Sequence, residues 1–309
     1  MRVLAAVDKF RGTATAAQVA ASIGHACWEN GHECIELPIA DGGEGTLEVL
    51  GGPNRTNRVT NPLGQPVDAQ WRLSRDLAVI EMARASGLSL VGGKENNDVI
   101  AASTIGTGEL IDTALNDGAK RIIVCVGGSA TVDGGLGAIR AIKSAARLRG
   151  VEFLVACDVR AKFTDAAKLF GAQKGASPAQ IEFLTSRLHA LVQTYKDEFG
   201  IDVSEIEGAG AAGGLAGGLA ALGAKLVPGF DIVADEVGLQ FNGREVARTV
   251  RQMGNRRVAG RGVGQRDHRG ERVGQDVAPQ HRPEGTTAAE RGFDVLAAAH
   301  PDHFRPGEA

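Results

Sequence analysis

The sequence predicts an α/β fold. Short apolar runs alternate with stretches of helical periodicity along most of the 309 residues, a pattern typical of a largely parallel sheet covered by helices. Hydrophobic residues make up 43% of the chain and charged residues 23%, so the chain can bury a core. We expect two lobes, one Rossmann-like with a mainly parallel sheet and one mixed α/β, with the active site in the cleft between them.

The first half of the chain repeats a strand-loop-helix order. The apolar run 4–7 predicts a strand that ends at Asp8, and the periodicity over 13–28 predicts a helix with Thr13 or Thr15 as its N-cap. A second strand, expected over 34–40, ends at a glycine-rich acidic turn.

The same order recurs further along. The segment 104–108 opens a helix, and a loop follows the apolar run 121–126. Because ligand sites gather at the carboxyl ends of parallel strands, we expect these loops to meet.

Two regions break the alternation. Residues 56–82 contain short apolar stretches around the turn 61–64 and predict antiparallel strands, whereas residues 166–222, including 178–199, are mainly helical. We therefore divide the chain into lobe one, roughly residues 1–50, 96–145 and 223–241; lobe two, roughly residues 51–95 and 146–222; and an atypical tail, residues 242–309.

The loop 127–135 reads Gly-Gly-Ser-Ala-Thr-Val-Asp-Gly-Gly. Its glycines leave backbone N–H groups to form an anion-binding nest, and Ser129 and Thr131 add hydroxyl groups. Asp133 provides a carboxylate that binds a metal or acts as a base. A glycine-rich turn without a ligand is the alternative.

The turn 41–45 carries two carboxylates, Asp41 and Glu44, among three glycines. One carboxylate would bind Mg²⁺ or a substrate hydroxyl, because phosphoryl transfer needs a hard cation held by few carboxylates together with phosphate oxygens. Helix capping is the simpler explanation. Among basic residues, Lys9, Arg11 and Lys174 lie in presumed loops near glycine, where a phosphate contact is favoured.

Several function classes are disfavoured. The net charge of −3 gives no basic surface for nucleic acid, and no apolar run reaches the roughly 18 residues that span a bilayer. The spacing of Gly208, Gly210 and Gly213 matches a dinucleotide fingerprint but lacks a preceding strand, so close helix packing competes with cofactor binding there. We expect a cytoplasmic protein that binds a small molecule and neither nucleic acid nor membrane, and we leave a homo-oligomer open.

Seven segments, taken in order, resemble the glycerate kinase family. The first, Asp8-Lys-Phe-Arg-Gly12, is similar to the family's Asp-Ser-Phe-Lys-Gly, with Lys9 in place of serine and Arg11 in place of lysine. The other six match nearly without change: Ala40 to Thr46, Ser103 to Leu110, Gly127 to Gly135, Ala156 to Val159, Phe170 to Ala176 and Gly208 to Gly214. The resemblance covers about residues 1–240 and implies an enzyme that moves the γ-phosphoryl group of ATP to a hydroxyl of glycerate with Mg²⁺.

Together with the resemblance, the motifs suggest a role for each residue. Asp8, Asp41 and Asp133 compete for the role of base or orienting carboxylate, and Arg11 is the candidate for binding the glycerate carboxylate. Further expected substrate contacts are Gly42, Gly43, Glu44, Ser129 and Thr131. Expected ATP contacts are Lys9, Thr107, Gly127, Gly128, Lys174, Gly210 and Gly213, and the expected Mg²⁺ ligands are Asp41 and Asp158.

The family pattern stops after about Leu239. Residues 242–309 contain no Lys, 12 Arg and four of the seven His, and the family's Thr-Gly-Glu-type loop and Gly-Lys pair are missing from them. We hypothesise that part of this tail is read in a shifted frame, with a divergent C-terminus and a disordered extension as alternatives. A nucleotide sequence in which no other frame restores these motifs would sink the hypothesis. The competing function is a catalytically inactive remnant that only binds a small acid or a nucleotide.

Overall fold

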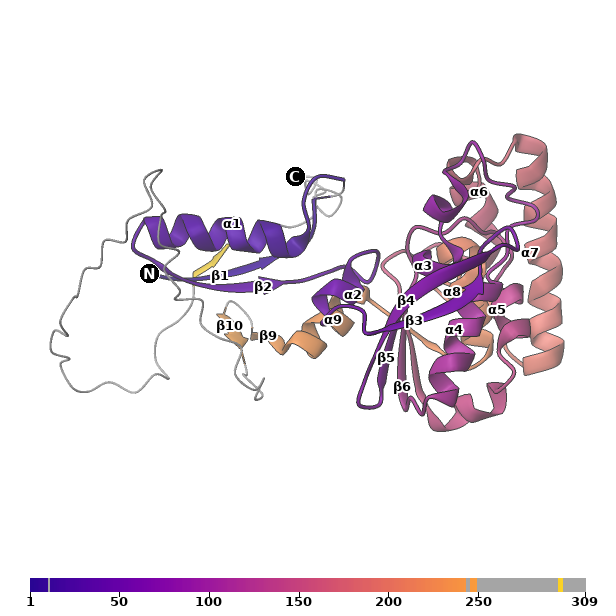
Figure 1. Ribbon diagram of the computed structural model, residues 1–309. Helices are drawn as coiled ribbons and strands as arrows, with labels where there is room; N and C mark the ends of the chain where they lie inside the picture. Colours follow the sequence, from indigo (N-terminus) through magenta and orange to yellow (C-terminus); the bar gives the residue numbers. More distant parts are fainter. Residues whose placement is uncertain (11, 243–244, 249–293, 297–309) are drawn as a thin grey trace, which may run out of the picture.

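The computed structural model describes residues 1–10, 12–242, 245–248 and 294–296 (Figure 1). Its strands form two main sheets in two lobes: a three-stranded sheet of order β11-β1-β2 and a six-stranded sheet of order β3-β4-β5-β6-β7-β8. The predicted α/β fold class is confirmed. No helix among the described residues combines the length and the apolar composition needed to cross a bilayer.

The smaller lobe holds the three-stranded sheet. Its strands β1 (Arg2–Val7), β2 (Glu33–Pro38) and β11 (Asp294–Leu296) all run parallel. Helix α1 (Ala16–Glu29) begins at Thr15, whose hydroxyl accepts a hydrogen bond of 3.2 Å from the backbone N–H of Gln18. Thr15 rather than Thr13 is therefore the N-cap.

Helix α9 (Gly229–Val237) connects the lobes. Its Ala234 belongs to a core cluster with Leu4 of β1, and its Ile232 belongs to another cluster with Ile123 of the six-stranded sheet. One short helix thus buries apolar side chains against both sheets. After it come β9 (Leu239–Asn242) and β10 (Glu245–Arg248), which pair antiparallel.

The larger lobe is built on the six-stranded sheet. Its strands are β3 (Arg55–Thr60), β4 (Pro66–Ser74), β5 (Leu77–Glu81), β6 (Arg121–Cys125), β7 (Glu152–Ala156) and β8 (Lys225–Val227). Strands β3 to β5 pair antiparallel and β5 to β8 pair parallel. The antiparallel strands predicted within 56–82 are confirmed, and the turn at 61–64 joins β3 to β4.

Helices cover both faces of this sheet. One face packs against α3 (Ala83–Ser86), α4 (Ile105–Asn116), α5 (Leu136–Ala141) and α8 (Leu215–Ala221), and the other against α2 (Thr46–Val49) and α9. A separate core lies beneath α6 (Ala166–Phe170) and α7 (Pro178–Phe199), which lie at the far end of the larger lobe (Figure 1).

The strands of each sheet give other lobe boundaries than those expected from the sequence. Strands β6 and β8, which we placed in lobe one, belong to the six-stranded sheet, where β6 lies between β5 and β7. The reason is that β6 is apolar on both faces, with Ile122 in one core cluster and Ile123 in another, as expected of a central parallel strand. The atypical tail lies outside the described residues, apart from Asn242, β10 and β11.

The segment 208–214 is a tight turn rather than a helix start after a strand. Ala212, Gly213 and Gly214 have positive φ angles of 52°, 69° and 91°. A Cβ added to Gly213 would overlap the carbonyl oxygen of Thr131. The glycines therefore allow two backbones to touch, which is the packing alternative to a dinucleotide fingerprint.

Substituting Gly213 tests this packing. We expect Gly213→Ala to lower the free energy of unfolding by about 3 kcal/mol, through the left-handed φ and the backbone overlap together. Gly223→Ala is the matched control, because Gly223 has a φ of 93° but no atom within 4 Å of an added Cβ; its cost should be about 1 kcal/mol. Urea unfolding measures both, and equal losses would contradict the packing argument.

Candidate functional site

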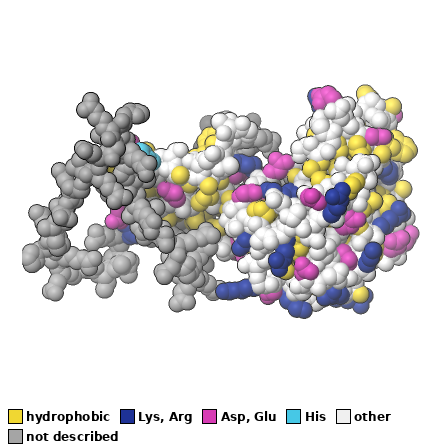
Figure 2. All heavy atoms as spheres, viewed as in Figure 1, with side chains coloured by type: hydrophobic (Ala, Val, Ile, Leu, Met, Phe, Trp, Pro, Cys, Tyr) yellow, Lys and Arg dark blue, Asp and Glu magenta, His cyan; other side chains and the backbone are white. Residues whose placement is uncertain are grey.

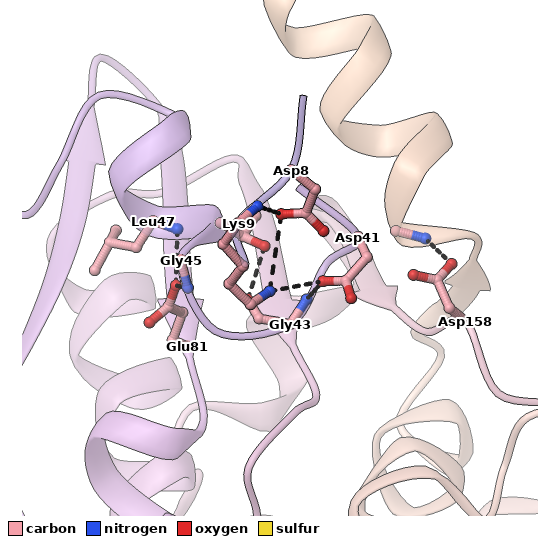
Figure 3. A network of polar contacts seen from close by, with 10 residues as sticks. Asp8, Lys9, Asp41, Gly43, Gly45, Leu47, Glu81 and Asp158 are labelled. Carbon is pink, nitrogen blue, oxygen red and sulfur yellow. Dashed lines mark hydrogen bonds and ion pairs between the residues drawn. The ribbon is translucent and has the colours of Figure 1, made fainter. Parts of the chain in front are cut away.

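Loops that follow five strands meet where the two lobes join. Asp8 follows β1, the turn 41–45 follows β2, Glu81 ends β5, the loop 127–135 follows β6 and Asp158 follows β7. Figure 3 shows Asp8 and Asp41 on the same side of the Lys9 side chain, with Asp158 beyond Asp41. The acidic side chains that the sequence marked at three strand ends therefore gather at one junction.

The turn 41–45 lies directly on the ends of β6 and β7. A Cβ on Gly42, which has a φ of 85°, would be 2.7 Å from both the Ala156 Cβ and the Gly229 Cα. A Cβ on Gly127 would be 3.1 Å from the Gly43 Cα. Only glycine at these positions lets the turn and the loop 127–135 approach so closely.

Asp41 is the most exposed of the three aspartates proposed as the base. Its side chain is 35% exposed, against 12% for the Asp8 side chain and 8% for Asp133. Its Oδ1 accepts the Gly43 N–H at 2.9 Å and lies 3.5 Å from Lys9 Nζ. Burial alone would raise the pKa of Asp41, but the Gly43 N–H and the Lys9 ammonium hold this pKa below its ordinary value.

Glu81 binds the turn 41–45 to the larger sheet. This residue was not identified from the sequence. Its buried Oε1 accepts the N–H groups of Gly45 at 2.8 Å and Leu47 at 2.9 Å, and its Oε2 lies 3.1 Å from Arg84 Nε. Burial raises the pKa of Glu81 despite the opposing effects of Leu47 and Arg84. A carboxylate at the end of the apolar run 77–80 is the signal that would have identified it.

The loop 127–135 is held by donors that bind its carbonyl groups. The pairs are Leu88 N–H with Gly128, Asn97 Nδ2 with Ala130, Lys174 Nζ with Thr131, Arg187 Nη2 with Val132 and Tyr195 Oη with Gly134. In contrast, no described residue accepts a hydrogen bond from the backbone N–H groups of Gly127, Gly128 or Ser129. Successive amides of this kind form an anion-binding concavity.

Asp133 makes structural contacts. Its Oδ2 accepts the Thr104 N–H at 2.9 Å, the Thr104 hydroxyl at 2.8 Å and the Gly137 N–H at 3.2 Å, and its Oδ1 accepts the Gly135 N–H at 3.1 Å. These contacts tie the start of α4 to the start of α5. The geometry favours this role over the catalytic role expected from the sequence.

Lys174 binds the loop 127–135 from the interior of the larger lobe. The side chain is buried, and Nζ donates to Ser129 Oγ and to the Thr131 carbonyl, both at 2.7 Å. Burial lowers the pKa of Lys174 to about 7, against the opposing charge of Asp133. The buried Thr131 hydroxyl has no hydrogen-bond partner among the described residues.

Three other expected ATP contacts lie inside the larger lobe. The buried Thr107 hydroxyl is 2.8 Å from the Ser86 hydroxyl, Gly210 donates its N–H to the Ala161 carbonyl, and Gly213 packs on Thr131. The contacts of Thr107 and Gly210 are internal to the larger lobe, and Gly213 supports the loop 127–135 through backbone packing. Arg11, the expected ligand of the glycerate carboxylate, lies outside the described residues.

The two expected Mg²⁺ ligands do not form a ready metal site. Among the described residues, no three His, Cys, Asp or Glu side chains are grouped closely enough to hold a metal ion. Asp41 Oδ1 is bound by Gly43 and Lys9, and Asp158 Oδ1 accepts the Gly229 N–H at 2.8 Å. Because Mg²⁺ demands six oxygen ligands, an ion here would depend on phosphate oxygens and water.

A surface cavity of about 510 Å³ adjoins the turn 41–45. Its walls include the carboxylates of Glu44, Asp68 and Glu81 beside Arg84. The Arg84 guanidinium already binds Glu81 and Glu48. The cavity is therefore acidic and does not suit an anionic substrate.

The different roles of Asp133 and Asp41 are testable by amide substitution. We expect Asp133→Asn to lower the free energy of unfolding by about 2 kcal/mol, because the amide nitrogen would face N–H and O–H donors. Asp41→Asn should cost less than about 1 kcal/mol, since its side chain is partly solvated. Urea unfolding of both variants checks this, and a larger loss for Asp41→Asn would show that the assignment is reversed.

The buried Lys174 should make stability depend on pH. Its pKa falls from 10.5 to about 7 on folding, so between these values the unfolded chain binds one more proton than the folded chain. The free energy of unfolding should therefore rise with pH above 7, by up to about 1.4 kcal/mol per pH unit. We expect the stability difference between wild type and Lys174→Met to grow in favour of wild type from pH 7 to 9 in urea unfolding. A difference that stays constant with pH would refute the assignment.

Comparison with known proteins shows the family of the chain. The sequence model of the glycerate kinase family matches residues 3–146 and 143–249. Glycerate 2-kinase of Escherichia coli (strain K12) is 37% identical over 280 residues, which cover 78% of this chain and 73% of that protein. Glycerate kinase of Halalkalibacterium halodurans is 38% identical over 276 residues, which cover 75% of this chain and 71% of that protein.

A solved structure matches as well. The crystal structure of a Salmonella typhimurium LT2 protein, provisionally named glycerate kinase 2, aligns with a TM-score of 0.65 at 33% identity and covers 76% of this chain and 74% of that one. The family match spans most of the chain, including the turn 41–45 and the loop 127–135. The chain therefore belongs to the glycerate kinase family.

Proposed function

We propose that this chain transfers the γ-phosphoryl group of ATP to a hydroxyl group of glycerate. Membership of an enzyme family whose named relatives are glycerate kinases supports the reaction. The contact between the turn 41–45 and the loop 127–135 is the observation that carries it. One loop offers a carboxylate for a hydroxyl and the other offers backbone N–H groups for a phosphate, and both are needed for phosphoryl transfer.

Asp41 is our candidate for the group that orients the glycerate hydroxyl and accepts its proton. It is ionised, it has the most exposed side chain of the three candidates, and its orientation is fixed by the Gly43 N–H. Asp8 lies nearby and is more deeply buried. Gly42, Gly43 and the exposed Glu44 remain proposed contacts of the glycerate hydroxyl groups on the same turn.

The N–H groups of Gly127, Gly128 and Ser129 are our candidates for binding the ATP phosphates. Lys174 supports this role from behind, because its hydrogen bonds to Ser129 and Thr131 fix the loop. Arg11 remains the proposed ligand of the glycerate carboxylate. We propose that Mg²⁺ enters on the nucleotide, held mainly by phosphate oxygens.

Three broader expectations stay proposals. We place the enzyme in the cytoplasm, where ATP is available, and we leave its oligomeric state open. We also retain the hypothesis that part of the tail is read in a shifted frame, which the nucleotide sequence will decide.

A coupled assay tests the function. The purified full chain with D-glycerate, ATP and Mg²⁺ should produce ADP in a glycerate-dependent manner. Asp41→Asn should lower kcat about 100-fold or more, because a positioned proton acceptor contributes on that scale. Glu182→Gln, at an exposed position on α7, is the matched control and should keep the wild-type rate.

Two outcomes would count against the proposal. If ATP or glycerate raises the melting temperature but no turnover occurs, the chain is a binding protein rather than a kinase. If Asp41→Asn and Glu182→Gln both keep the wild-type rate, the site is elsewhere.

A further inference from the structure

The Lys9 ammonium lies among the carboxylates at the junction. Its Nζ is 3.5 Å from Asp41 Oδ1 and 3.9 Å from Asp8 Oδ1 (Figure 3). The two carboxylates come from different strand ends, β1 and β2, and the Lys9 ammonium lies within 4 Å of both. The single Lys9 ammonium group thus pairs with two carboxylates.

Packing holds the Lys9 side chain in this position. The side chain is 18% exposed, and its Cδ would lie 3.6 Å from a Cβ on Gly45. The stem therefore runs along the glycine-rich turn, which leaves room for it, and the ammonium is directed to the acidic residues rather than to solvent.

Two carboxylates at neighbouring strand ends are also the kind of donor pair that a divalent cation selects. A cation bound to the same oxygens would lie close to the ammonium and be repelled by it. The Lys9 ammonium and a divalent ion would therefore compete for these carboxylates.

We infer that the Lys9 ammonium occupies the cation position between Asp8 and Asp41, so that these carboxylates are neutralised by the protein itself rather than by a protein-bound divalent ion. The inference deepens the proposed function by naming the residue that sets the metal requirement of the site. Its test uses the protein without substrates, so its failure is distinct from a failure of the kinase proposal.

Metal binding to Lys9 variants tests the inference. We expect the wild-type full chain to bind Mn²⁺ weakly in titrations followed by electron paramagnetic resonance, in the absence of nucleotide. Lys9→Ser removes the charge and the stem, and Lys9→Met removes the charge and keeps a long stem. Both should bind Mn²⁺ at least tenfold more tightly, because Asp8 and Asp41 lose their shared cation. Lys9→Arg keeps the charge and should bind as weakly as wild type.

A second substitution locates the effect. Asp41→Asn combined with Lys9→Met should abolish the gain in affinity. The inference is overturned if Lys9→Met binds Mn²⁺ no more tightly than wild type, if Lys9→Arg binds as tightly as Lys9→Met, or if wild type already binds tightly in an Asp41-dependent manner. Circular dichroism checks that each variant folds. If Lys9→Ser does not fold, Lys9→Met alone tests the inference.

Discussion

The close approach of the turn 41–45 to the ends of β6 and β7 sets the position of Asp41 relative to the loop 127–135. It depends on the missing side chain of Gly42, whose Cα faces Ala156 and Gly229. Glu81 binds the other end of the turn, and Asp158 holds the start of α9 beside it. Because these contacts come from separate elements, the position of Asp41 depends on several parts of the fold.

The loop 127–135 shows how a distant part of the lobe supports the junction. Tyr195 and Arg187 lie on α7, the long helix at the far end of the larger lobe, and both donate to carbonyl groups of the loop. Asn97 and Lys174 do the same from other segments. These donors satisfy the carbonyl groups of the loop from inside the lobe. The N–H groups of Gly127 to Ser129 can therefore bind a ligand while the carbonyl groups keep their hydrogen bonds.

The sequence predicted the strand ends and their small-residue loops well, because hydrophobic periodicity and glycine spacing are local signals. It could not predict which side chains point to the junction. Asp133 and Lys174 are turned inward by partners far away in the chain, such as Thr104 and Ser129. Glu81 went unnoticed because it ends a strand without any glycine. The observed sheets also differ from the predicted division into lobes. That division relied on local sequence signals, whereas β6 pairs with β5 and β7 through tertiary contacts.

Charge balance connects these observations. Among the described residues, the junction brings together Asp8, Asp41 and Asp158, while the single ammonium of Lys9 is shared by two of them. Lys174 is only partly charged at neutral pH, because burial lowers its pKa to about 7. A nucleotide adds further negative charge, which neutral N–H dipoles can orient but cannot cancel. We therefore expect a phosphate ligand to bring Mg²⁺ with it, while the described residues of the junction mainly place the reacting groups.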